Sequence, residues 1–518
     1  MNGWPLLTIL TLTPLLGALV TWGIGRDNAR AGRASAIAFS LLALLQAVLV
    51  VFQFNTTVTG LQFVERHQWI PTLHVDYFLA VDGLSILMVL LSALLIPFAL
   101  ALSPAAPDQP RGFHALFLLV QTGLFGTFTA LNFFHWFLFW EMGLVPAYFL
   151  IKLWGGENRR AAATQFLVYT LAGSVALLLA MVAVNFATDS FDFIQLADLA
   201  RSGELGRSLE TKLHWTGLSS GALSGLLFAG VFFGFAVKVP VMPFHTWLPD
   251  TYATAPASVT MVLTGAMSKM GVYGLLRILI PIFPQQMRDS LGLLMLLAVL
   301  TIVASAFSAF AQKDLKRLLA YSSMNHLGYC FLGLCAALEP SPNAALWSGE
   351  RTAALSGVLL QLFNHGITAA TLFGLVALIE KRSNGRRSLA DFGGLRQVAP
   401  VLAGLMGIAI FASVGLPGLN GFIGEFLIFK GAFPLAPIST AIATLGLLMT
   451  AVFYLTLIQR VFGGPLNPAW AKFPDLSRGE IALFVPSMTL IFIFGLAPGV
   501  ILTLVNPAVV EFVKRLAP

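Results

Sequence analysis

The chemistry of this sequence centres on a lysine that lies in a hydrophobic stretch and is followed at once by prolines: Gly-Phe-Ala-Val-Lys238-Val-Pro240-Val-Met-Pro243. An ammonium group near the centre of a bilayer costs about 2.5–3.5 kcal/mol even on lenient insertion scales. Each proline removes a helix hydrogen bond that lipid cannot replace. A charge beside unpaired backbone is costly to keep in a membrane, so the combination indicates a site where protons or ions pass.

A carboxylate is the expected partner of this lysine. Glu141 lies in Phe-Leu-Phe-Trp140-Glu141-Met-Gly-Leu-Val-Pro146, with no charged residue within ten positions on either side. Leaving it unpaired would be costly, and Lys238 is the natural candidate for the opposite charge. Two structural alternatives stay open: Glu141 could serve helix packing through hydrogen bonds, and Lys238 could cap the carbonyls that Pro240 frees.

Further ionisable side chains follow in later apolar stretches: His245, Lys269, His326, His365 and Glu425. A single histidine inside a membrane is often only a hydrogen-bonding residue between helices. Three histidines in this part of the chain, one before Lys269 and two between Lys269 and Glu425, fit a proton relay better, because imidazole exchanges protons near neutral pH. We therefore expect these five residues, together with Glu141 and Lys238, to form one proton path.

Three other charges have less certain roles. Lys430 lies five residues after Glu425 and could either pair with it or extend toward the membrane surface. Arg277 is expected to be an anchor at the membrane interface. Asp82, in Val81-Asp82-Gly-Leu-Ser85, is expected to cap the helix that follows it.

The elements that position these residues must be membrane helices. The chain is 57% hydrophobic and only 10% charged over its 518 residues, whereas soluble domains are about 25% charged. Because a crossing needs roughly 20 apolar residues, we predict an all-α polytopic protein with about fourteen spans. The expected spans are 5–24, 34–54, 78–102, 113–131, 132–152, 164–187, 222–248, 257–283, 289–311, 317–338, 353–379, 398–430, 435–460 and 481–505.

The net charge of +7 reflects topology and not nucleic-acid binding. Most of the 30 Lys and Arg residues fall in alternate loops, which the positive-inside rule places in the cytoplasm or stroma, with both termini on the outer side. The outer loop 188–221 is expected to be partly amphipathic, and 461–480 forms an inner linker. Cys330 and Cys335 are expected to be packing residues, since their spacing does not suit an iron–sulfur cluster. The sequence also contains no phosphate-binding loop and no dinucleotide fingerprint.

The chain carries an internal symmetry. Five spans after the break at Lys238, a second interruption occurs beside a charge in Gly415-Leu-Pro417-Gly418-Leu-Asn-Gly421-Phe-Ile-Gly424-Glu425. A unit of five spans repeated in tandem must be inverted, because an odd number of crossings reverses the side on which it begins. Paired interrupted helices in two halves are typical of a transporter's site.

Together these motifs resemble the antiporter-like subunits of respiratory complex I and its photosynthetic relatives, most closely the subunit M or chain 4 type. The resemblance covers roughly residues 75–460. It rests on Trp140-Glu141, Lys238-Val-Pro240, His245-Thr-Trp-Leu-Pro-Asp250, Ser268-Lys269-Met-Gly, Gln312-Lys-Asp-Leu-Lys316-Arg-Leu-Leu-Ala-Tyr-Ser-Ser and Leu-Pro417-Gly…Gly-Glu425. Many paralogues have lysine at the last position, so Glu425 favours the M type. The segment Asp250-Thr-Tyr-Ala-Thr-Ala-Pro256 departs from the family pattern and is closer to cation/proton antiporter subunits or specialised photosynthetic variants.

The resemblance implies four regions: N-terminal spans in 1–112, a proton-translocating five-helix repeat in 113–283, an inverted repeat in 289–460, and a linker with a final span in 461–518. It implies a proton-pumping subunit of an NAD(P)H– or ferredoxin–quinone oxidoreductase in a bacterial inner or thylakoid membrane. This chain would hold no cofactor. NAD(P)H or ferredoxin, iron–sulfur clusters and quinone would belong to partner subunits, and the neighbours would include further antiporter-like subunits.

In the expected mechanism, moving Glu141 away from Lys238 drives the lysine's proton to Lys269. The proton then passes through His326 and His365 to Glu425. A subunit of a multisubunit Na+/H+ antiporter is the alternative, and a structural membrane anchor is a third interpretation.

Overall fold

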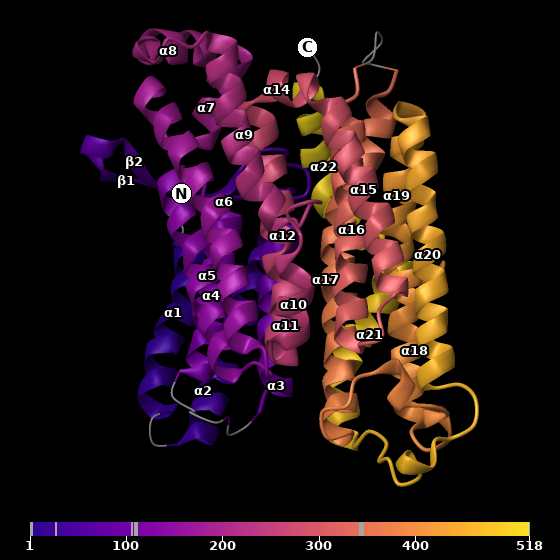
Figure 1. Cartoon of the computed structure of the whole chain (residues 1–518). Coiled ribbons are helices and arrows are strands. Elements are labelled where there is room, and N and C mark those ends of the chain that lie inside the picture. The colour runs from indigo at the N-terminus through magenta and orange to yellow at the C-terminus, as the bar shows by residue number, and fades with distance from the viewer. Residues whose placement is uncertain (1–3, 26–27, 105–106, 108–111, 341–345, 517–518) are drawn as a thin grey trace.

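The computed structural model describes residues 4–25, 28–104, 107, 112–340 and 346–516, and shows a long bundle of roughly parallel helices (Figure 1). Among the described residues, ten helices are long and apolar enough to cross a membrane, and three shorter apolar helices accompany them. The first six are α1 (Leu6–Gly25), α2 (Ala29–Gln53), α3 (Ile86–Leu102), α4 (Phe113–Thr129), α5 (Phe133–Trp154) and α6 (Arg159–Thr188). The fold class is therefore the helical membrane bundle that the composition predicts.

The first predicted break is confirmed. Helix α9 (Ser220–Lys238) ends at the lysine, and the short helix α10 (Trp247–Thr254) starts only after an irregular segment. The Val241 amide bonds back to the carbonyl oxygen of Ala236 at 2.9 Å. The Met242 amide donates to the Thr301 hydroxyl at 3.0 Å. Neighbouring groups thus satisfy backbone that lipid would leave unpaired.

The next span contains two π-helical segments, which the sequence did not reveal. It runs as α11 (Ala257–Val262), η3 (Leu263–Met267), α12 (Lys269–Gly274), η4 (Leu275–Leu279) and α13 (Ile280–Ile282). A π turn inserts an extra residue and frees a carbonyl, and such turns are frequent at functional sites. Lys269 follows the first π segment directly.

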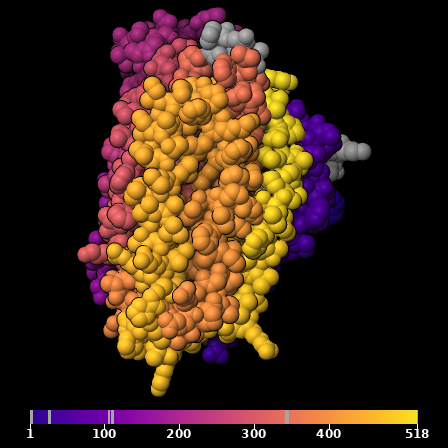
Figure 2. All heavy atoms as spheres, turned by 90° about the vertical axis from the view of Figure 1, so that its right-hand side faces the viewer, coloured from indigo at the N-terminus to yellow at the C-terminus, as the bar shows by residue number. Residues whose placement is uncertain are grey.

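The second half of the chain repeats this plan. Its elements are α14 (Pro284–Asp289), α15 (Leu291–Phe310), α16 (Leu315–Ala337), α17 (Ser348–Arg382), α18 (Pro400–Val414), α19 (Asn420–Leu435), α20 (Pro437–Val461), α21 (Arg478–Leu496) and α22 (Gly499–Leu516). The predicted second break lies between α18 and α19, where Gly415 and Gly418 have φ values of 80° and 93°. Only glycine adopts this left-handed region readily, so the two glycines permit the break. Figure 2 shows that atoms of this half, in orange and yellow, cover most of the face turned toward the viewer.

The third and the last of the predicted spans differ from the structure. The predicted last span, 481–505, is divided at Pro498: α21 ends at Leu496, and α22 begins at Gly499 and continues to Leu516. Residues 78–81, predicted as the start of the third span, belong to a strand: β1 (Gln62–Ile70) pairs antiparallel with β2 (Val75–Val81) around the short helical turn η1 (Pro71–Leu73). The Glu65 carboxylate accepts hydrogen bonds from the amides of Leu7 and Thr8 at 2.7 and 3.1 Å, which caps α1 and anchors the hairpin. The loop 188–221 forms α7 (Phe193–Arg201), α8 (Glu204–Lys212) and η2 (His214–Thr216). It is partly amphipathic as predicted: in α8 the leucines are buried and the charged residues are exposed, whereas Trp215 in η2 is exposed.

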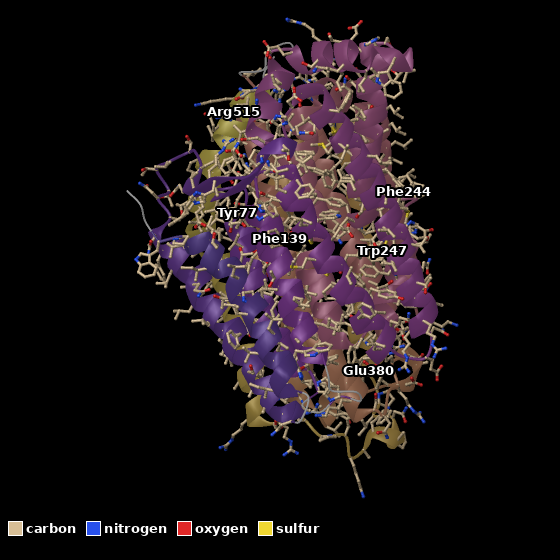
Figure 3. The ribbon with its side chains drawn as sticks, turned by 90° about the vertical axis from the view of Figure 1, so that its left-hand side faces the viewer. Tyr77, Phe139, Phe244, Trp247, Glu380 and Arg515 are labelled. Carbon is tan, nitrogen blue, oxygen red and sulfur yellow. The ribbon has the colours of Figure 1, made fainter. Side chains whose placement is uncertain are left out.

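The inner face carries the basic loops and three short helical turns, η5 (Leu389–Asp391), η6 (Leu395–Gln397) and η7 (Pro468–Trp470). Large apolar side chains are exposed along the flanks of the bundle, for example Leu179 at 65% and Leu448 at 62%. Exposed apolar surface on this scale is the mark of contact with lipid or other membrane subunits. Figure 3 shows the two ends, with Glu380 near the inner face and Tyr77 and Arg515 toward the outer face.

Candidate proton-transfer site

Lys238 is the first buried charge of the site. It is the last residue of α9, its side chain is buried, and its ammonium nitrogen lies 4.9 Å from the centre of the Trp140 ring on α5. A desolvated cation over an indole face gains up to about 2 kcal/mol. The Trp140 indole is itself held by a 2.9 Å hydrogen bond from Nε1 to the Ser174 hydroxyl. The lysine therefore lies against an aromatic ring.

Glu141 acts on Lys238 by its charge but does not touch it. The carboxylate is within electrostatic range of the ammonium group. Among the described residues, however, no ion pair within 4 Å joins the two, which differs from the expected contact. The reason is the direction of Glu141, which shares a helix face with the exposed Leu138 and Val145 and is only half-buried. Its Oε1 atom is nevertheless buried without a hydrogen-bond partner.

Lys269 is completely buried in the next span. Its ammonium group donates at 2.5 Å to the carbonyl oxygen of Thr264 in the π segment, which also accepts from the Ser268 hydroxyl at 3.0 Å. It also lies 2.8 Å from Nδ1 of His365 on α17 and 3.5 Å from the Ser268 hydroxyl. A carbonyl oxygen, a hydroxyl and an imidazole surround the ammonium group, and no carboxylate in the described part of the chain forms an ion pair with it. This arrangement can exchange a proton with His365 over a single hydrogen bond.

The two histidines from different helices form the centre of the site. The rings of His365 on α17 and His326 on α16 are 4.9 Å apart between centroids, tilted by 38°. Nδ1 of His326 lies 2.9 Å from Oε1 of Glu425 on α19. Nε2 of His326 is buried without a hydrogen-bond partner, so a water molecule is the expected occupant beside it. The order is thus Lys269, His365, His326, Glu425, which reverses the expected order of the two histidines.

Glu425 is held by residues that the sequence analysis did not single out. Gln361 lies one helical turn before His365, and its Nε2 donates to Glu425 Oε1 at 3.2 Å while lying 3.3 Å from His326 Nδ1. The start of α19 is fixed by two crossed bonds, from the Asn364 side chain to the Asn420 carbonyl at 2.8 Å and from the Asn420 side chain to the Asn364 carbonyl at 3.2 Å. The spacing of Gln361 from His365, one turn on the same helix face, was the available signal.

The structure leaves one expected member apart. His245 lies in the break between α9 and α10, half-buried, with Nδ1 buried and unpartnered. No hydrogen bond or ion pair among the described residues connects it to Lys269, His365, His326 or Glu425. Its expected role in the path therefore stays a prediction.

Two further charges differ from their expected roles. Arg277, expected at the membrane interface, is only 8% exposed and forms an ion pair of 2.5 Å with Asp82. Asp82 does not cap α3 as expected: the residue before the helix is Ser85, and the Asp82 carboxylate accepts the amide of Leu84 at 3.0 Å, within the turn that precedes the helix. Lys430 is exposed and forms no ion pair with Glu425 among the described residues, which settles the open choice in favour of extension outward.

Comparison with known proteins identifies the family of the chain. The family model described as "NADH:quinone oxidoreductase/Mrp antiporter, TM" matches residues 130–450. The chain therefore belongs to the NADH:quinone oxidoreductase/Mrp antiporter family of membrane subunits. This stretch contains Glu141, Lys238, Lys269, both relay histidines and Glu425.

Within the family the chain is of the subunit M type. It is 33% identical to NADH-quinone oxidoreductase subunit M of Rickettsia felis over 505 residues, 96% of each chain. It is 34% identical to subunit M of Rhodobacter capsulatus, covering 98% of this chain and 96% of the relative. Among solved structures, respiratory complex I from Thermus thermophilus contains a chain with a TM-score of 0.83 and 27% identity, covering 99% of this chain and all of that one. A chain of the Mrp complex from Dietzia, at 21% identity and a TM-score of 0.81, shares the fold.

Proposed function

We propose that this chain is a proton-translocating membrane subunit of an NADH-quinone oxidoreductase in a bacterial inner membrane. The observation that carries the proposal is the series Lys269–His365–His326–Glu425, in which groups from four spans meet inside the bundle. Buried ionisable groups are expensive in a membrane and mark proton pathways when they lie in series. Similarity to the subunit M proteins supports the same assignment.

The series suits proton transfer because neighbouring groups are of types that exchange protons. His365 can take a proton from Lys269 through their 2.8 Å contact. His326 can pass one to Glu425 through the 2.9 Å contact. Among the described residues, no direct hydrogen bond joins the two imidazoles, so we assign that transfer to a water at the unpartnered Nε2 of His326.

The electrostatic force that moves the proton would come from the first half of the chain. Lys238 and Glu141 interact through space, so a change of charge or position at Glu141 alters how firmly Lys238 holds its proton. Moving one charge against 100 mV costs about 2.3 kcal/mol. Interactions between close charges in a medium of intermediate dielectric are of this size or larger. The electron donor, the iron–sulfur clusters and the quinone would belong to partner subunits, including further antiporter-like membrane subunits.

The experiment is the substitution Lys269→Met in the assembled complex. Proton uptake by inverted membrane vesicles is measured together with the rate of NADH oxidation. We expect the protons moved per NADH to fall, since the central donor is lost, while Lys430→Met, which removes an exposed lysine, leaves the ratio unchanged. An unchanged ratio in Lys269→Met would overturn the proposal. Dependence of pumping on Na+, tested by replacing it with choline, would favour a sodium-coupled antiporter instead.

A further inference from the structure

A polar hollow opens on the inner face, away from the relay. It has a volume of about 560 Å3 and is lined mainly by polar surface. Its walls are the loop after α5 (residues 154–158), the junction of α10 and α11 (residues 253–257), and the side chains of Lys316, Glu380 and Arg387. Figure 3 shows Glu380 at this end of the bundle. The hollow therefore reaches from the inner solution to the start of α16 and the end of α17.

A buried ammonium group forms the floor of the hollow. The Lys316 side chain is only 3% exposed, and its Nζ lies 3.1 Å from the Glu380 carboxylate, which is 27% exposed. Nζ also donates to the Ala255 carbonyl oxygen at 3.1 Å. Arg387 borders the same pair, 3.6 Å from Glu380 and 3.2 Å from Asp314. One partner of the Lys316–Glu380 pair thus meets solvent while the other is enclosed in protein.

Hydroxyl groups lead from this pair toward the relay. Ser323 lies seven residues after Lys316 on α16, which places both on one face of that helix. The Ser323 hydroxyl is 2.8 Å from the Thr264 hydroxyl, and the Thr264 carbonyl oxygen accepts from Lys269. The Tyr252 hydroxyl, on α10, interacts with Ser268 and Thr264. Two helical turns separate Lys316 from Ser323, about 10 Å of rise, which a short water chain spans.

An unsatisfied hydroxyl indicates where such water would bind. Ser258 follows Ala257, which lines the hollow, and its side-chain oxygen is buried without a hydrogen-bond partner. Buried polar atoms of this kind are satisfied by ordered water in native proteins. The region between the hollow and Lys269 therefore contains several hydroxyl groups and one position where a bound water molecule is expected.

We propose that the Lys316–Glu380 pair is the point at which this chain takes up protons from water on the inner face. The inference rests on the proposed proton-translocating function. When Lys269 is neutral, Lys316 releases one proton toward Lys269. Lys316 then receives one proton from hydronium in the hollow by way of Glu380. Each hydroxyl or water in between gives up one proton as it accepts another. The net change is one proton moved from the inner solution to Lys269.

The first test separates proton uptake from a purely structural ion pair. Glu380→Gln keeps an oxygen acceptor for Lys316 but cannot take up a proton at neutral pH. We expect pumping per NADH to fall by about 10²-fold, the loss typical of removing a positioned proton-transfer group. The matched control is Asp250→Asn, which removes the ion pair between Asp250 on α10 and Arg317 on α16 without altering the hollow. Normal pumping in an assembled Glu380→Gln complex would overturn the proposal.

The second test blocks the hollow without touching either charge. Gly156 lines it, and an added Cβ would meet only the Thr254 carbonyl oxygen at 3.7 Å, so Gly156→Cys fits. Inverted vesicles, which expose the inner face, are treated with a membrane-impermeant cationic methanethiosulfonate. We expect pumping to fall at least about tenfold, because blocking proton uptake should have an effect approaching the loss of a positioned proton-transfer group. Dithiothreitol, which removes the label, should restore pumping. The wild-type complex, treated in the same way, measures the effect of the reagent on native cysteines. In this chain the native cysteines Cys330 and Cys335 are buried.

Gly479→Cys is the matched control, because this exposed inner-face glycine has open space around its Cβ and does not line the hollow. Normal pumping after full labelling of the cysteine at position 156 would overturn the proposal. The result for Lys269→Met tells the two failures apart. If that variant loses pumping while both tests of the hollow are negative, uptake occurs elsewhere and the proposed function stands. If that variant also pumps normally, the proposed function itself fails.

Discussion

Nδ1 of His365 lies 2.8 Å from the ammonium nitrogen of Lys269, although 96 residues separate them in the chain. This contact joins the two halves of the molecule, because Lys269 follows the first broken helix and His365 precedes the second. A proton that leaves the first half therefore has a direct acceptor in the second half.

Lys238→Met is expected to abolish pumping while the complex still assembles. Methionine matches the apolar length of lysine and lies well against Trp140, but it cannot carry a proton. We expect a loss of about 10²-fold or more in protons moved per NADH. Vesicle acidification and the NADH oxidation rate measure it, and the amount of complex in the membrane checks assembly. Retained pumping would refute the role of Lys238.

Glu425 and His326 are expected to act as one unit. Glu425→Gln and His326→Gln should each reduce pumping by about 10²-fold, because either change removes one end of the 2.9 Å contact. The double variant should be no worse than the single ones, as for residues that act in one step. Pumping rates of the four proteins decide this. Multiplicative losses would show that the two residues work independently.

Trp140→Leu is expected to lower pumping about three- to tenfold, because a cation over an aromatic face gains roughly 0.5–2 kcal/mol. Trp140→Phe keeps an aromatic face and should retain most of the activity. Both changes also remove the bond to Ser174. Ser174→Ala removes that bond alone and serves as the control. Equal losses in the Leu and Phe variants would contradict a role for the aromatic ring.

Arg277→Met is expected to destabilise the chain by about 3–5 kcal/mol, since it leaves Asp82 buried without its partner. The midpoint temperature of unfolding and the yield of assembled complex measure this effect. Adding Asp82→Leu should restore part of the loss, because the unpaired carboxylate is then removed. Arg515→Met breaks a solvent-exposed pair with Glu511 and should cost less than about 1 kcal/mol.

The breaks and the chemical types of the site were predictable from the sequence. Pro240 and Gly415 lie within apolar stretches, where such residues predict a break in a membrane helix. Ionised groups in these stretches are rare and therefore easy to recognise. The order of the histidines was not predictable, because it depends on how α16 and α17 cross. The direction of Glu141 depends in the same way on the rotation of α5.

Other features lacked a local signal. Residues 78–81 are apolar and were included in the predicted third span, because so short an apolar run cannot be assigned to a strand or a helix by periodicity. The partner of Arg277 lies 195 residues away, which no local pattern reports. Lys316 looked like an ordinary basic loop residue because its burial arises from the packing of α10, α16 and α17 around it.

The outward direction of Glu141 has a consequence for the life of the chain in the cell. With Leu138 and Val145 on the same face, a carboxylate would meet acyl chains if the subunit were alone in the bilayer. Solitary copies should thus be short-lived, and membrane proteases should remove whatever is made in excess of its neighbours. We expect another membrane subunit to cover this face of α5, and synthesis of this chain would then have to keep pace with synthesis of that subunit.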